Sequence, residues 1–230
     1  VTAISTKAFA GKNIRAIQLS DQIKTIPAGA FKNCSALEEI SGSFTEIGDE
    51  AFSGCTSLSN FNVSAAVTSI GSNAFYGVPK VTAKVLNESS AVAAATTANP
   101  DASTEEINAS ARELTQSVVS AVANSGADNI VMDLSDVIDG TELAINVPKI
   151  ESIELQGGKR TFSNLHLSSD AGVTTLKEIT IKNSDGTPLK LSSQSITLEA
   201  VNINSAGFAL LLSADGADLA LIRDSQITSE

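Results

Sequence analysis

The chain has 230 residues, 42% of them hydrophobic and 18% charged, so it is long and apolar enough to bury a core and is not a disordered polypeptide. Its formal net charge is −11 and it has no basic cluster, which argues against binding to nucleic acids or to anionic membranes. Aromatic residues make up only 4%, so the core must be mainly aliphatic. No apolar run approaches the roughly 20 residues of a membrane-spanning helix.

An Ala-Phe pair recurs through the first third of the chain, at intervals of 22, 21 and 23 residues. An isoleucine lies five residues before each Phe, and a small predicted turn follows each Phe. A period of this length indicates stacked coils of a solenoid, because one coil cannot bury its own apolar edges. We expect each Phe to fill the interior of its coil. The four pairs are Ala8-Phe9, Ala30-Phe31, Ala51-Phe52 and Ala74-Phe75.

The two cysteines, Cys34 and Cys55, are 21 residues apart and occupy the same position in adjacent coils. Stacked strands lie about 4.8 Å apart, which a disulfide tolerates. Equivalent side chains point in parallel, however, and free Cys is among the most buried residue types. The sequence therefore favours two buried thiols, with a disulfide as the alternative.

The segment 47–58 reads Ile-Gly-x-x-Ala-Phe-x-Gly-Cys-x-x-Leu, and it resembles the BspA-type leucine-rich repeat. The resemblance covers four copies over residues 1–85, and the two outer copies are degenerate, as terminal repeats of a solenoid are. It implies a surface or secreted protein of a host-associated bacterium or a protist, with adhesion or host-matrix binding as the usual role. We expect any signal peptide or anchor to lie outside the sequence given.

Residues 86–102 are rich in Ala, Ser, Thr and Asn without clear periodicity, and they predict a linker. A helix is predicted from Ser103, because Glu106 follows it in capping-box spacing. We expect this helix to cover the open end of the next domain, with Gly126 just past its C-terminus. Its apolar stripe consists of Ile107, Ala111, Leu114, Val118 and Val122.

The remainder, from residue 129 to 230, is dominated by short predicted strands. The spacing apolar-x-x-apolar-x-apolar recurs between turns rich in Gly, Asn, Ser and Asp. It predicts a second stack of coils, similar to the right-handed parallel β-helix of pectate-lyase-like proteins, with a β-sandwich as the alternative. The copies are Ile150-Ile153-Leu155, Phe162-Leu165-Leu167, Leu176-Ile179-Ile181 and Leu198-Val201-Ile203.

The sequence thus predicts a mainly β, repeat-solenoid fold with three parts. These are a leucine-rich repeat domain over 1–85, a linker over 86–102, and a capping helix with a β-helix-like domain over 103–230.

Candidates for chemistry are few. The single histidine, His166, has no nucleophile signature near it and is expected to face outward between two inward leucines. A group of acidic residues has a spacing of three, which does not fit the alternating ligands of a calcium loop, so we expect a solvated acidic edge. The sequence predicts no catalytic residue, no metal and no cofactor. The acidic residues are Asp133, Asp136, Asp139 and Glu142.

The resemblance to β-helix proteins raises polysaccharide cleavage, which in such enzymes uses an acidic calcium site and a basic residue on one face. The only arginines of that part are Arg160 and Arg223, and no carboxylate cluster aligns with either. A meeting of Arg160 or Lys159 with an acidic patch would favour this activity. Sugar binding without cleavage usually needs aromatic platforms, which this chain lacks. The outward glutamates Glu154, Glu178 and Glu199 are expected to decorate exposed strands.

We therefore expect a non-enzymatic, extracellular or cell-surface interaction module that binds a protein partner, such as a host or matrix protein, through solenoid faces. The alternatives are a glycan-binding or polysaccharide-cleaving protein and a structural spacer. Nucleic acid binding and membrane insertion are not expected. By strand geometry, the predicted partner-binding residues are Glu38, Glu39, Ser59, Asn60 and Asn62.

Overall fold

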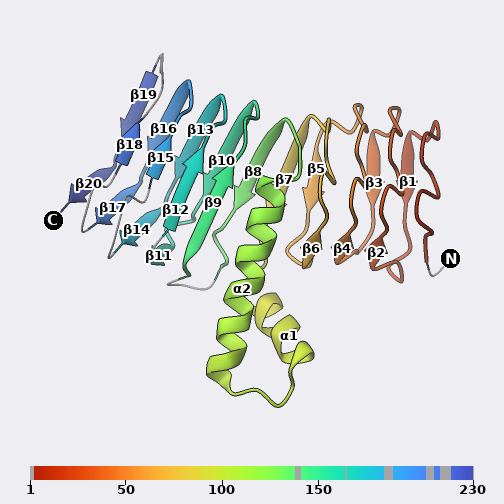
Figure 1. Cartoon of the computed structure of the whole chain (residues 1–230), viewed down its shortest axis with the longest axis horizontal. Coiled ribbons are helices and arrows are strands. Elements are labelled where there is room, and N and C mark those ends of the chain that lie inside the picture. Colours follow the sequence, from red (N-terminus) through yellow and green to blue (C-terminus); the bar gives the residue numbers. More distant parts are fainter. Residues whose placement is uncertain are drawn as a thin grey trace.

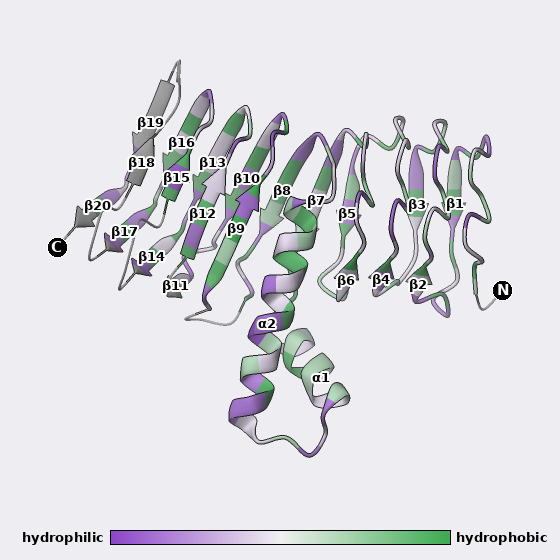
Figure 2. Ribbon diagram, in the orientation of Figure 1, coloured by the Kyte–Doolittle hydropathy of each residue, from purple (hydrophilic) through white to green (hydrophobic). Residues whose placement is uncertain are grey.

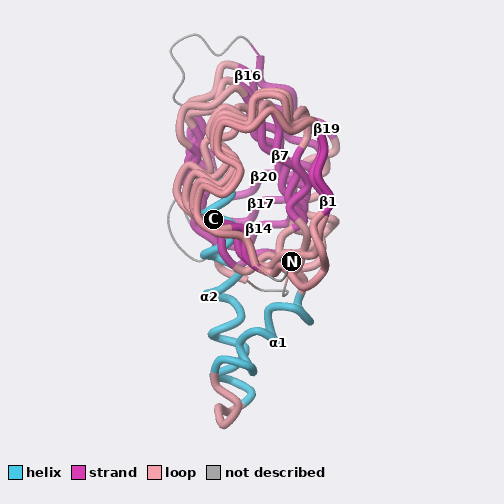
Figure 3. The backbone as a smooth tube through the Cα atoms, turned by 90° about the vertical axis from the view of Figure 1, so that its right-hand side faces the viewer, coloured by secondary structure: helices cyan, strands magenta, loops and turns pink. Residues whose placement is uncertain are grey.

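The structure is a computed structural model that describes residues 3–137, 141–163, 165–183, 189–205, 210–212 and 219–229. The chain winds into one row of coils, with the first and last described segments at opposite ends of the row (Figure 1). Viewed along this axis, the coils superpose around a common interior, and two helices project from one side (Figure 3). Every strand pairing between the described residues is parallel, as stacking of successive coils requires.

The N-terminal coils each contribute a strand to two sides of the solenoid. On one side β1 pairs with β3, and β5 follows in the next coil. On the other side the strands have only two residues each and pair in the order β2-β4-β6. The bounds are Ala16–Gln18 (β1), Glu39–Ser41 (β3) and Phe61–Val63 (β5), and Thr25–Ile26 (β2), Glu46–Ile47 (β4) and Ser69–Ile70 (β6).

The repeat phenylalanines form a ladder through the interior of these coils. The ring centroids of Phe9 and Phe31 are 5.0 Å apart, those of Phe31 and Phe52 are 5.4 Å apart, and those of Phe52 and Phe75 are 5.7 Å apart. The interplanar angles are 11°, 2° and 4°. Phe31, Phe52 and Phe75 are fully buried. The predicted role of the Phe as the filling of its coil is confirmed for these three, whereas Phe9 in the first coil is half-buried.

Main-chain hydrogen bonds join the Ala-Phe turns of successive coils. The amide of Phe9 donates to the carbonyl of Ala30 at 2.8 Å, and the same bond recurs from Phe31 to Ala51 and from Phe52 to Ala74. The turns approach so closely that a Cβ on Gly48 would lie 2.6 Å from the amide nitrogen of Ala28. The glycine after the repeat isoleucine is therefore required by contact with the neighbouring coil.

Two helices interrupt the row after β7 (Lys80–Lys84). Helix α1 (Glu88–Ala98) begins at Asn87, whose side chain accepts a hydrogen bond from the amide of Ser90 at 2.8 Å. The segment predicted as a linker therefore contains a helix, which lies against helix α2 (Thr104–Ala123). The linker itself stays a prediction, and the helix was not predicted because the buried residues of α1 are alanines, which give no apolar periodicity.

Helix α2 begins with the predicted capping box, in which the Ser103 hydroxyl accepts from the Glu106 amide and the Glu106 carboxylate accepts from the Ser103 amide. Of the predicted stripe, Ala111, Val118 and Val122 are buried. The helix packs between β6 and β9 (Leu143–Val147) on one side of the solenoid. It thus covers the open edge of β9 in the following half, while its role as the cap of a separate domain stays a prediction.

A single seven-stranded sheet, which we call the long sheet, is continuous past the point in the sequence where the two helices are inserted. Strand β7 pairs with β8 (Asn129–Asp133), with Lys80 opposite Asn129 and Lys84 opposite Asp133. The division of the chain into two domains stays a prediction, and the sheet is continuous across it. The strand order is β5-β7-β8-β10-β13-β16-β19, where β10 is Ser152–Gln156, β13 is Val173–Lys177, β16 is Ser195–Glu199 and β19 is Leu219–Arg223.

In the second half each complete coil adds one strand to each of three parallel sheets. After its strand in the long sheet, the chain enters the β11 sheet and then the β9 sheet. This arrangement confirms the predicted mainly β, repeat-solenoid fold, while the likeness to pectate-lyase-like β-helices stays a prediction. The β11 sheet consists of β11 (Thr161–Ser163), β14 (Thr180–Asn183), β17 (Asn202–Ser205) and β20 (Gln226–Ser229), and the β9 sheet of β9, β12 (Leu165–Ser169), β15 (Leu189–Leu191) and β18 (Leu210–Leu212).

Alternation along these strands separates an apolar interior from a polar exterior, as the green and purple segments of Figure 2 show. Leu155, Leu176 and Leu198 lie in register in the long sheet and are fully buried. A group of three polar residues also faces inward: Thr174 Oγ1 lies 2.7 Å from Ser169 Oγ and 2.5 Å from Ser193 Oγ. Because all three hydroxyls are buried, this chain of hydrogen bonds satisfies them within the core.

Both cysteines are free and buried, as the parallel side-chain geometry predicted. The Cys34 thiol donates to the carbonyl of Phe9 at 2.9 Å, and the Cys55 thiol donates to the carbonyl of Phe31 at 3.1 Å. Burial raises the pKa of the Cys55 thiol to about 12. These are structural thiols.

Candidate interaction face

The five predicted partner-binding residues lie on one side of the N-terminal coils, in or beside β3 and β5. Their side chains are all exposed: Glu38, Glu39, Ser59, Asn60 and Asn62. The inward neighbours Leu58, Phe61 and Val63 are buried, so strand alternation determines which side chains face solvent. We call these five residues the N-terminal face.

Part of the N-terminal face is organised by its own hydrogen bonds. Asn60 Nδ2 donates to Asn62 Oδ1 at 3.3 Å, and Thr82 Oγ1 donates to Asn60 Oδ1 at 3.0 Å. In the neighbouring coil Arg15 Nε lies 3.6 Å from Glu38 Oε1. Thr82 and Arg15 were not predicted. Because Asn62 pairs with Thr82 in the register of β5 and β7, knowledge of that register would have identified Thr82.

The exposed side of the long sheet continues this polar surface into the second half. Lys177 Nζ lies 3.0 Å from Glu154 Oε1, to which Gln156 Nε2 also donates at 2.7 Å. Burial acts to raise the pKa of Glu154, but the hydrogen bonds from Gln156 and Lys177 outweigh it and lower that pKa below its usual value. The carboxylate of Glu154 is therefore bound by two neighbours in the exposed surface of this sheet.

Of the acidic residues noted in the sequence, Asp136 and Asp133 both lie near Lys84, and together they raise its pKa. Asp133 accepts a hydrogen bond from the amide of Ser135, whereas Asp136 forms a 2.7 Å ion pair with Lys84. Glu142 lies apart, in a cleft beside α2, and Asp139 is outside the described residues. Across the residues that the structure describes, no three His, Cys, Asp or Glu side chains converge as metal ligands would.

Of the residues considered for polysaccharide cleavage, Glu178 and Glu199 line one cleft of about 380 Å³ together with Lys177. Arg160 Nε donates to the main-chain carbonyl of Ser135 at 2.7 Å, so it contacts the loop between Asp133 and Asp136 through the backbone. His166 is half-buried on the outward side of β12, between two buried leucines, as predicted. Glu154 is bound to Lys177, in the long sheet.

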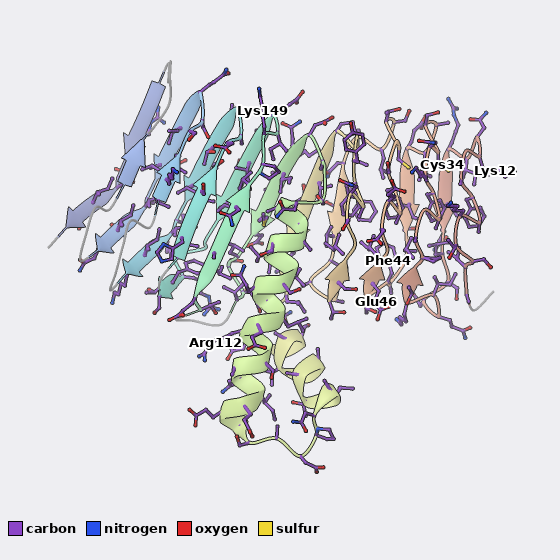
Figure 4. All side chains as sticks on the ribbon, in the orientation of Figure 1. Lys12, Cys34, Phe44, Glu46, Arg112 and Lys149 are labelled. Atoms are coloured by element: carbon purple, nitrogen blue, oxygen red, sulfur yellow. The ribbon has the colours of Figure 1, made fainter. Side chains whose placement is uncertain are left out.

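A cleft of about 560 Å³ lies between α2 and the start of β9, and no sequence pattern pointed to it. Its lining includes Arg112, which projects from the outer part of α2 (Figure 4), and Glu142. At its inner end Gln116 bonds both main-chain groups of Ala144: Nε2 donates to the carbonyl at 2.7 Å, and Oε1 accepts from the amide at 2.8 Å. The glutamine thereby replaces a neighbouring strand at the edge of β9.

In the described ranges, neither helix has the length and apolarity needed to cross a membrane. Searches of curated proteins and of solved structures found no match to the chain. The sequence model of the BspA type leucine rich repeat region, which holds six copies, matches residues 1–117 of the 230. The match extends beyond the four predicted copies, across α1 and most of α2. The chain belongs to the BspA-type leucine-rich repeat family.

Proposed function

We propose that this chain is a non-enzymatic interaction module of a secreted or cell-surface protein, and that it binds a protein partner through the N-terminal face. Repeats of this family are typically interaction modules associated with cell surfaces, which supports both the class of function and the location. Adhesion to a host or matrix protein is the specific role that we propose.

The observation that carries the proposal is the exposed, regular strand surface of the N-terminal coils. Rigid coils present a large contact area with little loss of conformational freedom on binding. The bonds among Asn60, Asn62 and Thr82 hold these side chains in place before a partner arrives. Glu38 and Glu39 add negative charge in the preceding coil, which suits a partner with exposed basic side chains.

The test is binding of the purified chain to an array of extracellular-matrix proteins at physiological salt, since low salt would exaggerate attraction between a chain of net charge −11 and basic proteins. We expect saturable binding to a matrix protein. The double variant Asn60→Arg/Asn62→Arg should lose it, because two long cations would occupy the contact surface.

The matched control is Asn202→Arg/Asn204→Arg, which makes the same exchange in the same Asn-x-Asn pattern on β17, in a different sheet. Binding that survives the β5 exchange but not the β17 exchange would contradict the placement of the site. No saturable binding to any matrix protein would contradict the adhesion role and support a structural spacer.

A further inference from the structure

The outer surface of the β11 sheet differs chemically from the rest of the solenoid. Strands β14, β17 and β20 lie in register, so Thr180, Asn202 and Gln226 form one row across the coils. Lys182 and Asn204 form a second row, two residues further along the strands. A groove of about 230 Å³ runs between these rows, over the backbone of Ile181 and Ile203. We call these five side chains the β11-sheet face.

The polar groups of this face are unpaired. In the described part of the chain, the five side chains make no hydrogen bond or ion pair. On the long sheet, by contrast, Asn129 donates to Glu151 at 2.9 Å and accepts from Ser152 at 2.6 Å. Asn129 is half-buried, but the exposed Asn60 and Asn62 of β5 also bond to neighbours on that sheet, whereas the exposed Asn202 and Asn204 bond to no described side chain.

The chemistry of the β11-sheet face restricts what it can bind. Its amides and hydroxyl both donate and accept hydrogen bonds, and they repeat about every 4.8 Å along the axis. It holds one cation, Lys182, which is too few for a nucleic-acid backbone. It carries no aromatic, Met or Arg side chain, the types that anchor protein interfaces.

We propose that the β11-sheet face binds a neutral, extended polysaccharide lying along the solenoid axis. The hydroxyl groups of such a chain donate and accept, as the amides require, and each sugar residue advances by roughly the spacing of the strands. Without aromatic stacking, each coil contributes weakly. Binding therefore needs several coils and a polymer, and a monosaccharide does not compete.

The experiment is native gel electrophoresis of the full chain in gels containing hydroxyethylcellulose or a soluble mannan, both neutral, or polygalacturonate, which is acidic. We expect one of the neutral polymers to retard the chain. The variant Asn202→Ala/Asn204→Ala should weaken this affinity about tenfold, because it removes two hydrogen-bonding groups per chain. The matched variant Asn60→Ala/Asn62→Ala, on the N-terminal face, should leave it unchanged.

Three results would overturn the proposal. These are no retardation by either neutral polymer, retardation by polygalacturonate alone, and equal retardation of Asn202→Ala/Asn204→Ala and the unaltered chain. If Asn202→Ala/Asn204→Ala instead abolished binding to a matrix protein, the ligand of the β11-sheet face would be a protein and not a polysaccharide. Thermal unfolding of each variant checks that the exposed exchanges leave the fold intact. Because the two faces are tested by separate variants, failure here is distinguishable from failure of the protein-binding role.

Discussion

The main-chain carbonyl of Ser125 accepts a hydrogen bond from the amide of Phe75 at 2.9 Å, in the position that the carbonyls of Ala30, Ala51 and Ala74 hold in the earlier coils. Ser125 follows α2 by two residues, so the series of main-chain hydrogen bonds between coils continues immediately after the two helices. Its hydroxyl is fully buried and has no hydrogen-bond partner among the described residues. Ser125 thus occupies the position that alanine holds in the earlier coils, and its hydroxyl is the added group that finds no partner in the described structure.

We therefore expect Ser125→Ala to raise the free energy of unfolding by about 1–2 kcal/mol, the cost of an unsatisfied buried hydroxyl. Chemical denaturation measures it. Ser35→Ala, in an exposed turn, is the matched control and should change stability by less than about 0.5 kcal/mol. A loss of stability in Ser125→Ala would mean that the hydroxyl has a partner.

Gly48→Ala should destabilise the chain by about 3 kcal/mol, because the new Cβ would lie 2.6 Å from the Ala28 nitrogen and force two coils apart. The control is Gly77→Ala. Gly77 has φ +73° and nothing within 4 Å of the position that a Cβ would occupy, so only backbone strain of about 1 kcal/mol is expected. Equal losses in urea unfolding would show that crowding between coils is not the cause.

The Cys55 thiol predicts an alkaline limit to stability. Burial, with the adjacent Cys34, raises its pKa from 9.0 to about 12 in the folded chain. A raised folded pKa stabilises the fold fully below pH 9, and this contribution is lost as the pH rises towards 12, where the unfolded thiol ionises first. Urea unfolding across this range should show a falling free energy, and Cys55→Ala should flatten the slope. An unchanged slope would refute the assignment.

Gln116→Ala should lower the free energy of unfolding by about 2 kcal/mol, because both main-chain groups of Ala144 lose their partner at the edge of β9. Hydrogen exchange of the Ala144 amide should accelerate. Arg112→Ala, one turn earlier on the same helix, is the control, since in the described structure Arg112 forms neither a hydrogen bond nor an ion pair. Unaltered exchange at Ala144 in Gln116→Ala would contradict the edge-covering role.

The repeats could be predicted because each Phe is followed by its neighbour 21 to 23 residues later, and only stacked coils bury such a series. The apolar spacing of the second half also located buried residues, with only Ile150 partly exposed, but it marks three different corners. Phe162-Leu165-Leu167 joins β11 to β12, whereas Leu176-Ile179-Ile181 joins β13 to β14. Any corner between two inward-facing strands produces this spacing, so it does not reveal the number of sheets.

What the sequence did not reveal depends on contacts between distant residues. Helix α1 is held by small buried residues, Ala91 and Ala95, which carry no periodic signal. The cleft beside α2 is lined by Arg112 and Glu142, which are 30 residues apart in the sequence. The exposure of Asn62 was predictable from alternation in β5, whereas the bond of Asn60 to Thr82 required the register of β5 and β7.

The pairing of β7 with β8 has a consequence for ligands that engage both halves. The halves are joined by hydrogen-bonded strands, so the N-terminal face and the β11-sheet face keep a fixed distance and angle. Two ligands held by such a rigid spacer are presented to each other at an effective concentration that the fold determines, without the averaging of a flexible tether. A bivalent ligand gains from this arrangement only when its own geometry matches that of the solenoid.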